Sequence, residues 1–262
     1  MSAISEFGKY FSVSLATTPE ERTSAYRIRY RVYCEEFKYF PPDLPSVADP
    51  IECDEFDSRS LHCLVTHKSS GIVAGCVRVV TTQSSMYEDP LPLEKYCADG
   101  LSLEALELLN LDRKSMGEIS RLAVDPQFRR RRGACSQLQE VADGVSFSPE
   151  EKRVFSAIAV AGLMAAAAIS ELMDKTTIFA MMDPALPRLL RASGMSPARI
   201  GREVNYYGPR TPYCITAQSF HEEISSELRS FYYDTYSHFE TEYADIIGQF
   251  GRDYSYAATV AI

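Results

Sequence analysis

The sequence predicts an α/β domain with a mostly antiparallel central sheet, followed by a helical C-terminal extension. Two features support this prediction. Runs of strand character alternate with runs of helix character from residue 10 to residue 217, and two adjacent strand-like runs are joined by a short turn, as in a hairpin. No repeat or convincing linker divides the 262 residues. We therefore expect one domain over residues 1–218, with helices over residues 219–262 packed on it.

The first elements have clear boundary signals. The alternating run at 10–17 predicts a strand, and Thr18 followed by Pro19 predicts the N-cap and first position of a helix that continues to about Phe37. The proline-rich segment 41–50 is expected to be a loop. Residues 61–67 and 71–80 are rich in β-branched residues and are joined by Lys-Ser-Ser-Gly, which predicts a hairpin.

The later elements follow from the same patterns. The composition and periodicity of the segments predict a helix near 101–109, a strand over 117–124 and a polar irregular stretch at 134–153. They then predict an alanine-rich helix over 154–173, a strand over 176–182, a helix from Asp183 to Gly194, and strands near 199–207 and 212–217. From Ser219 to about Phe250, apolar residues recur at spacings of three and four. This spacing predicts helix, packed on the domain or on a partner.

Composition excludes several classes of function. A net charge of −9 argues against nucleic acid or an anionic membrane as a bulk electrostatic partner. Seven cysteines without a CxxC pair indicate reduced thiols and a cytoplasmic protein, and the four histidines have no metal-ligand spacing. The N-terminus lacks the pattern of a secretory signal. The apolar run at 154–173 is mostly alanine, so we expect a buried core helix and no integral membrane association.

The stretch GEISRLAVDPQFRRRRGA, residues 117–134, concentrates the candidate chemistry. Glu118 and Arg121 could form a simple ion pair, but in a strand they point to opposite faces unless a bulge intervenes, and bulges often lie beside active sites. The arginine run that ends at Gly133 predicts a phosphate-binding turn; nucleic acid or a solvated loop are alternatives. The members of this run are Arg129, Arg130, Arg131, Arg132 and Gly133.

This stretch resembles the central strand and pyrophosphate turn of the GCN5-related N-acyltransferase (GNAT) fold, which binds a phosphopantetheine thioester there. A wider set of positions resembles the pattern of acyl-homoserine-lactone autoinducer synthases, which have the same fold and take their acyl group from acyl carrier protein. Those positions are Arg29, Tyr33, Tyr39, Asp54, Asp57, Arg78, Glu118 and Arg121. Two departures are the tyrosines, where those synthases tend to have Phe and Trp, and the insertion at 134–153.

The chain is more similar, over roughly residues 10–217, to N-acyl amino acid synthases and to acyltransferases associated with PEP-CTERM/exosortase systems. Four separated stretches carry this resemblance: YRIRYRVYCEEF, ECDEFDSRSLHCLV, EISRLAVDPQFRRR and NYYGPRTPY. The resemblance implies transfer of a fatty acyl group to the amine of an amino acid. The alanines at 165–168 and the small residues near Met181 and Met182 would leave room for a medium or long chain. Two alternatives stay open: a lactone-forming autoinducer synthase, and a non-catalytic module that binds acyl carrier protein.

The donor is expected to be acyl carrier protein in preference to CoA, with no tightly bound cofactor. The usual acetyl-CoA turn ends in a glycine or another small residue, whereas here Gly133 is followed by Ala134 and Cys135, so the final small position is lost. A phosphopantetheine arm has one phosphate and its carrier protein is acidic. The four arginines, together with Lys152 and Arg153, would suit both.

By resemblance, Glu118 is the candidate general base that takes a proton from the acceptor amine. Backbone N–H groups around Leu122 and Val124 would stabilise the oxyanion, while these two side chains fill the core. By the same resemblance Arg29, Asp54, Asp57 and Arg78 organise the acceptor side, where Arg29 or Arg78 would bind an acceptor carboxylate. The alternative for each arginine is a structural ion pair with Asp54 or Asp57. Tyr33 and Tyr39 either line the pocket or only pack, and Tyr206, Tyr207 and Tyr213 could protonate the leaving thiolate.

Overall fold

A computed structural model describes residues 3–39, 50–82, 89–109, 111–129 and 146–250. Within these residues eight strands form one sheet in the order β1-β2-β3-β4-β5-β8-β6, with β7 paired to β8. Neighbouring strands are antiparallel except β4 and β5, which are parallel. The strands are β1 (Phe11–Leu15), β2 (Ser60–His67), β3 (Val73–Thr81), β4 (Met116–Val124), β5 (Thr177–Met182), β6 (Ala198–Arg199), β7 (Val204–Asn205) and β8 (Pro209–Thr216).

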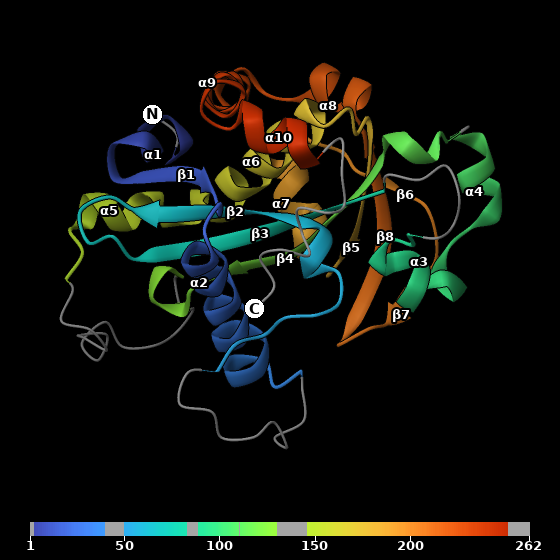
Figure 1. The fold of residues 1–262 in the computed structure, drawn as a ribbon, viewed down its shortest axis with the longest axis horizontal. Helices are drawn as coiled ribbons and strands as arrows, with labels where there is room; N and C mark the ends of the chain where they lie inside the picture. The colour runs from blue at the N-terminus through green and yellow to red at the C-terminus, as the bar shows by residue number, and fades with distance from the viewer. Residues whose placement is uncertain (1–2, 40–49, 83–88, 110, 130–145, 251–262) are drawn as a thin grey trace.

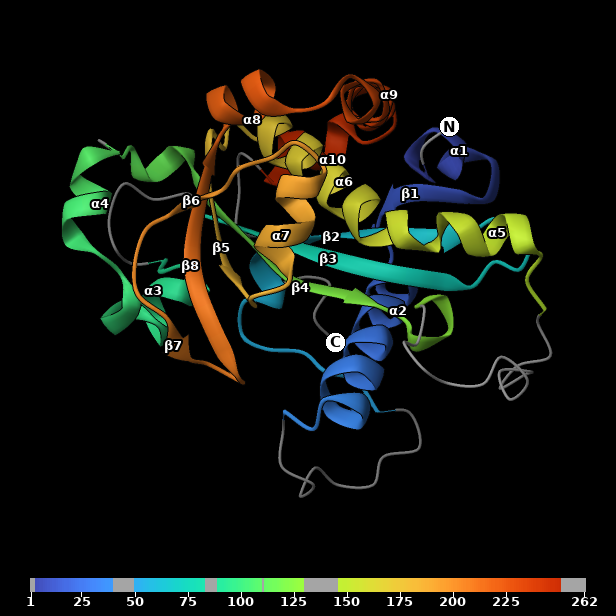
Figure 2. The same ribbon diagram turned by 180° about the vertical axis from the view of Figure 1, so that it is seen from behind.

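Helices cover both faces of the sheet (Figure 1; Figure 2). One face packs against α6 and the C-terminal α9, and the other against α2. The helices are α1 (Ala3–Tyr10), α2 (Pro19–Arg29), α3 (Pro92–Tyr96), α4 (Leu103–Leu108), α5 (Pro149–Val154), α6 (Ile158–Leu172), α7 (Leu186–Ala192), α8 (Ala217–Glu223), α9 (Ser226–Glu242) and α10 (Ala244–Phe250). The predicted mixed architecture with a mostly antiparallel sheet is confirmed.

The capping signals produce the expected local structure at the start of α2. The Thr18 side chain accepts a hydrogen bond from the backbone N–H of Glu21, and the Glu21 side chain accepts one from the Thr18 backbone, so both ends of a capping box are present. The helix does not continue as a regular α-helix to Phe37, because residues Tyr30–Glu36 form a π-helix. Such segments are often found at functional sites.

Three expectations from the sequence were incomplete. The N-terminal α1 was not predicted, although Ile4 and Phe7 are buried against the core. Part of the stretch at 134–153 that was expected to be irregular is the capped helix α5, while residues 134–145 lie outside the described residues. The strand expected near 199–207 is two short strands, β6 and β7, which both pair with β8.

The alanine-rich helix α6 is the centre of the main core. It contacts β2, β3 and β4 on one side and α9 on the other, and eleven of its fifteen residues are buried. By length and composition, Pro149–Leu172 is the one described helical stretch that could cross a membrane, but 78% of its apolar window is buried. Its packing is that of the core helix the sequence predicts. The domain boundary at residues 218 and 219 stays a prediction.

Candidate active site

Strands β4 and β5 separate part-way along their length. Their parallel ladder runs only from Met116, opposite Thr177, to Glu118, opposite Phe179. Beyond that point a cavity of about 440 Å³ opens between them, lined by residues of both strands. Its lining comes from both faces of the sheet, so the cavity passes through the sheet where the two strands diverge. This volume is in the usual range for a small-molecule site.

A β-bulge in β4 sets the direction of the side chains here. Cys76 of β3 lies opposite Ala123 and Arg78 opposite Ser120, so Arg121 and Leu122 together face one residue of β3. Arg121 has a φ of +53°, a left-handed conformation that costs a non-glycine residue about 1–2 kcal/mol. The extra residue places Arg121 on the same face as Glu118 and directs Leu122 to the opposite core. The sequence analysis required a bulge for Glu118 and Arg121 to share one face of the strand, and this bulge is present.

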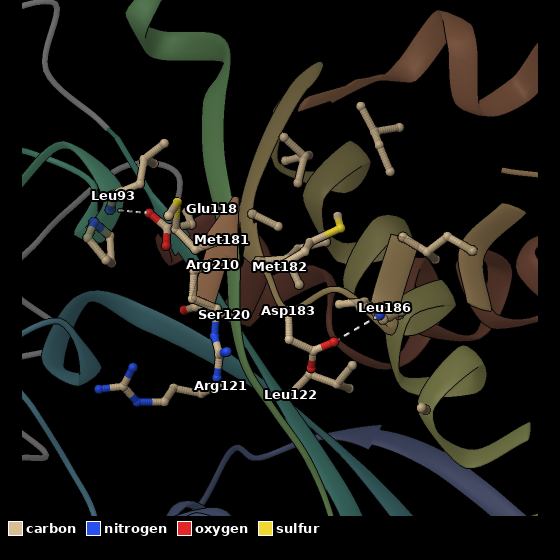
Figure 3. Close-up of a pocket in the computed structure, with 18 of the residues that line it drawn as sticks. Leu93, Glu118, Ser120, Arg121, Leu122, Met181, Met182, Asp183, Leu186 and Arg210 are labelled. Carbon is tan, nitrogen blue, oxygen red and sulfur yellow. Dashed lines mark hydrogen bonds between the residues drawn. The ribbon is translucent and has the colours of Figure 1, made fainter. Parts of the chain in front are cut away.

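Glu118 is almost fully buried, with 2% of its surface exposed, and it lines the cavity. Its Oε2 accepts a hydrogen bond of 2.8 Å from the backbone N–H of Leu93, at the start of α3 (Figure 3). Burial raises the pKa of Glu118 to about 8, against the opposing influence of that hydrogen bond and of nearby Arg78 and Arg121. A carboxylate with this pKa can both accept and release a proton near neutral pH.

Leu122 and Val124 line the cavity and also pack against the core that contains α6, as expected. The carbonyl oxygen of Leu122 accepts a hydrogen bond of 2.8 Å from the hydroxyl of Tyr33. This bond holds the bulged part of β4 against the π-helix that carries Tyr33. The role of the backbone N–H groups around Leu122 in stabilising an oxyanion stays a prediction.

Next to this site lies a largely buried network of three guanidinium groups and three carboxylates. Its members are Arg29, Arg78, Arg121, Glu52, Asp54 and Asp57. Arg29 binds both carboxylate oxygens of Asp57, at 2.6 and 2.9 Å, and also contacts Glu52. Because the guanidinium of Arg29 stabilises the ionised form, the pKa of Asp57 lies below its usual range despite burial. The network is formally neutral, which is how buried charges are tolerated.

The network corrects two sequence expectations. Arg29 and Arg78 are 0% and 1% exposed, carboxylates of the protein bind both, and neither lines the cavity. Direct contact of either with an acceptor carboxylate was therefore the wrong alternative, and the structural ion pair was the right one. The possible ion pair between Glu118 and Arg121 is also absent, because Arg121 binds Glu52 and Asp54 at 3.1 and 2.8 Å.

Tyrosines form one wall of the cavity. Tyr33 and Tyr39 both line it and stack with their ring centroids 6.1 Å apart, and Tyr39 also contacts Tyr207. Tyr206 lines the cavity as well, and burial raises its pKa. Tyr213 packs against the main core and does not line the cavity, so it is not placed to protonate a thiolate there.

Of the arginine run, only Arg129 lies within the described residues. Arg129 lines the cavity, forms an ion pair with Glu36 and lies over the ring of Phe37 at 5.7 Å. Arg130, Arg131, Arg132 and Gly133 lie outside the described residues. Directly after β4, the described part of the chain forms a single 3₁₀ turn over Pro126–Phe128.

The opposite half of the cavity, on the α6 side of the sheet, is largely apolar. Its lining residues come from β5, α6, α7, β8, α8 and the segment after α7, and include Leu163, Met164, Ala167, Ile178, Ala180, Met182, Leu186, Leu190, Met195, Ile215 and Phe220. The small side chain of Ala167 leaves space between α6 and β5, as the alanine-rich sequence suggested, and three methionines supply adaptable surface.

Four residues of the site were not singled out from the sequence. Leu93 supplies the N–H that binds Glu118, the thiol of Cys97 lines the cavity close to that carboxylate, Glu52 joins Arg29 to Arg121, and Arg210 lines the cavity from β8. Glu52 lies in ECDEFD and Arg210 in NYYGPRTPY, both within stretches that carried the family resemblance. The resemblance was a usable signal for these two, whereas nothing marked Leu93.

Residues 28–139 match the family model of the acetyltransferase (GNAT) domain. The chain carries a GNAT acyltransferase domain. It is therefore an enzyme rather than a non-catalytic carrier-binding module, which was one of the alternatives. No curated protein matches the sequence. Strand β4 with its bulge lies within the matched residues.

Solved structures agree with the GNAT fold of this acyltransferase. TofI, solved in a ternary complex with an inhibitor and MTA, is 17% identical, with 85% of this chain and 96% of that chain covered and a TM-score of 0.52. The AHL synthase LasI is 16% identical, with 82% and 97% covered and a TM-score of 0.50. FeeM, an N-acyl amino acid synthase from uncultured soil microbes, is 12% identical, with 82% and 94% covered and a TM-score of 0.49.

Proposed function

We propose that this acyltransferase moves a medium or long fatty acyl group from the thioester of an acyl carrier protein to the amine of an amino acid. The observation that carries the proposal is the position of Glu118, a buried carboxyl with a pKa of about 8 in a cavity that crosses the sheet. A polar, tyrosine-lined half faces Glu118, and an apolar half lies on the other side of the sheet. The first suits an amine acceptor, and the second suits an acyl chain.

In the proposed reaction the ionised Glu118 takes a proton from the acceptor ammonium, directly or through one water. The freed amine lone pair attacks the thioester carbon, a C–N bond forms and the carbonyl oxygen becomes an oxyanion. Backbone N–H groups near Leu122 would stabilise that charge. The carbonyl then re-forms as the C–S bond breaks and the nitrogen gives up its second proton, which balances the proton that the leaving thiolate takes up. Tyr206 and Tyr207, which line the cavity, are candidates to protonate it.

The donor assignment is supported by the basic residues downstream of β4. Arg129 lines the cavity, and Lys152 and Arg153 are exposed on α5. In the sequence, these residues and the rest of the arginine run are a local concentration of positive charge in an acidic protein. Such a concentration suits an acidic carrier and its single phosphate, which is the reason to place carrier protein before CoA.

A second candidate function is a lactone-forming autoinducer synthase. The observation in its favour is the fold shared with TofI and the AHL synthase LasI. Mass spectrometry of the product separates the two, because transfer to an amino acid gives an N-acyl amino acid and the second reaction gives a lactone. A lactone product would replace the proposed acceptor class and leave the role of Glu118 in place.

The test of the proposal is Glu118→Gln, assayed with dodecanoyl carrier protein and a mixture of the common amino acids. We expect the variant to bind the donor normally and to lose thiol release by about 100-fold or more, because general-base catalysis contributes on the order of 10²- to 10⁴-fold. The matched control is Glu222→Gln, an exposed carboxylate on α8. Full activity of Glu118→Gln would overturn the proposal, as would a wild-type enzyme that forms no acyl amide.

A further inference from the structure

Four positively charged side chains line the cavity within the described residues: Arg121, Arg129, Lys175 and Arg210. Arg121 and Arg129 form ion pairs with carboxylates of the protein. Lys175 is buried and donates to two backbone carbonyl oxygens, those of Thr82 and Lys114. Arg121 and Arg129 are thus charge-paired, and backbone oxygens hold Lys175 beside the Met116–Thr177 pair, at the closed end of the gap between β4 and β5, whereas Arg210 lies toward the open end.

The guanidinium of Arg210 has only neutral partners. Nη1 donates to the backbone oxygen of Pro209 at 2.9 Å, Nη2 donates to the hydroxyl of Tyr39 at 3.2 Å, and its carbon lies 5.6 Å from the centre of the Tyr39 ring. No ion pair joins it to any carboxylate in the described part of the chain. A half-buried guanidinium in a cavity without an acidic partner is suited to bind an anionic ligand.

The acidic side chains of the cavity are otherwise engaged. Glu118 accepts from Leu93, Glu171 binds His221 and the hydroxyl of Tyr232, and Asp183 accepts from two backbone N–H groups at the start of α7. None of them compensates the charge of Arg210.

Arg210 lies on the same face of the sheet as Glu118. In the ladders Glu118 is opposite Phe179, and Phe179 is opposite Cys214 on β8. Side chains alternate along a strand, so residues 210, 212 and 214 of β8 share one face. Arg210 therefore extends from the Glu118 side, nearer the open end of the gap between β4 and β5, and Figure 3 shows both side chains around this part of β4.

We propose that Arg210 binds the carboxylate of the acceptor, which restricts acceptors to amino acids with a free carboxylate. This inference rests on the proposed function and assigns its acceptor site. Two N–H groups of a guanidinium match two carboxylate oxygens, and an α-amino acid held there presents its amine toward Glu118. The ring of Tyr39 holds the guanidinium in place before the acceptor arrives.

A phosphate of the donor arm is a second anion that a guanidinium could bind, so the experiment measures both substrates. The best acceptor among the common amino acids is first found by mass spectrometry, and its carboxamide is then compared with it. In the wild type we expect the amide to have a KM about 10- to 100-fold higher than the acid, since a charged hydrogen-bonded pair contributes on the order of 1.5–3 kcal/mol.

Arg210→Gln should raise the KM of the amino acid by the same factor, leave the KM of dodecanoyl carrier protein unchanged, and remove the preference for the acid over the amide. Arg210→Lys should keep part of that preference. The control is Arg202→Gln, an exposed arginine paired with Asp99 on the surface. Melting temperatures of both Arg210 variants establish that each is folded.

A rise in the KM of the donor alone would assign Arg210 to the donor phosphate and overturn the inference. So would an equal loss of activity toward acid and amide, which indicates a structural role. In either case acyl amide is still formed by the wild type, so the proposed function stands. If the wild type forms no acyl amide with any amino acid, the proposed function itself fails.

Discussion

Glu118 and Arg121 lie on the same face of β4 and both line the cavity, but they do not form an ion pair. Glu52 and Asp54 bind the guanidinium of Arg121, whereas the Glu118 carboxyl faces a backbone N–H. A direct pair would hold the pKa of Glu118 low and make it a poor base. Glu52 and Asp54 therefore compensate the charge of the partly buried Arg121, so that Glu118, three residues away, keeps a raised pKa.

The first prediction concerns the pH dependence of activity. Since burial raises the pKa of Glu118 to about 8, the ionised form decreases as the pH falls below that value. We expect kcat/KM for acyl transfer to fall about tenfold per pH unit below pH 8. The measurement is the initial rate of thiol release from dodecanoyl carrier protein at pH values from about 5.5 to 9.5. Half of the limiting rate should be reached at about pH 8.

The acceptor amine also titrates, so its contribution must be separated. Acceptors whose amines differ in pKa provide the control. If Glu118 causes the fall of kcat at low pH, the pH at which kcat is half-maximal should stay the same when the acceptor is changed. A midpoint that follows the amine pKa from one acceptor to the next would show that the carboxyl does not limit the reaction.

The second prediction concerns stability and uses the same pKa. Glu118 has a pKa of about 8 in the folded protein against 4.5 for the ordinary side chain, so between these values the folded state binds more protons than the unfolded state. Stability from this group is complete below pH 4.5 and is lost as the pH rises to about 8, at up to roughly 1.4 kcal/mol per pH unit.

Glu118→Gln removes this titration. Urea unfolding at pH 5 and pH 8 should therefore show that the variant gains stability relative to the wild type as the pH rises. An identical difference between the two proteins at both pH values would mean that Glu118 has an ordinary pKa in the folded state.

The elements that the sequence predicted well are those defined by local chemistry. Thr18 and Pro19 start α2, the Lys-Ser-Ser-Gly turn joins β2 to β3, and the alanine-rich run forms the buried helix α6. In each case the signal and its result lie within a few residues. Glu118, which was selected because its stretch resembles a family motif and its strand character was clear, lines the cavity, while its role as a base stays a prediction.

The sequence could not decide which partners pair over long distances. The pairing of Arg29 with Asp57, 28 residues away, was one of several alternatives, and the pairing of Arg121 with Glu52, 69 residues away, was not suggested. The sequence shows that acids and arginines are present but not which arginine they leave unpaired. That outcome depends on the bulge at Arg121 and on the side-chain direction along β8, which is why Arg210 was missed and Arg29 was considered in its place.

The third prediction tests the buried network through Asp57, which contacts both Arg29 and Arg78. Asp57→Asn removes the negative charge and leaves two buried guanidinium groups undercompensated. We expect the free energy of unfolding to fall by about 3–5 kcal/mol. The matched control is Glu55→Gln in the same loop, whose carboxylate is half exposed and pairs with Lys95 at the surface, and which should unfold at the wild-type urea concentration. Equal unfolding midpoints for the two variants would contradict a structural role for the network.

The fourth prediction concerns the length of the acyl chain. Ala167 of α6 lines the apolar half of the cavity, so Ala167→Leu would fill space that the end of a long chain occupies. If the larger side chain displaces two methylenes, the lost burial is about 1.6 kcal/mol, equivalent to roughly fifteenfold in rate. We expect kcat/KM to fall by about that factor for the longest donor accepted and to change little for a donor shorter by four carbons.

Ala192→Leu, an exposed position on α7, is the control because it adds the same side chain outside the cavity. The measurement compares carrier-protein donors of six to sixteen carbons at equal concentration. A uniform loss across all lengths would point to distortion of α6 rather than to a shortened pocket. An unchanged length profile, with normal activity, would place the acyl chain somewhere other than the space between α6 and β5.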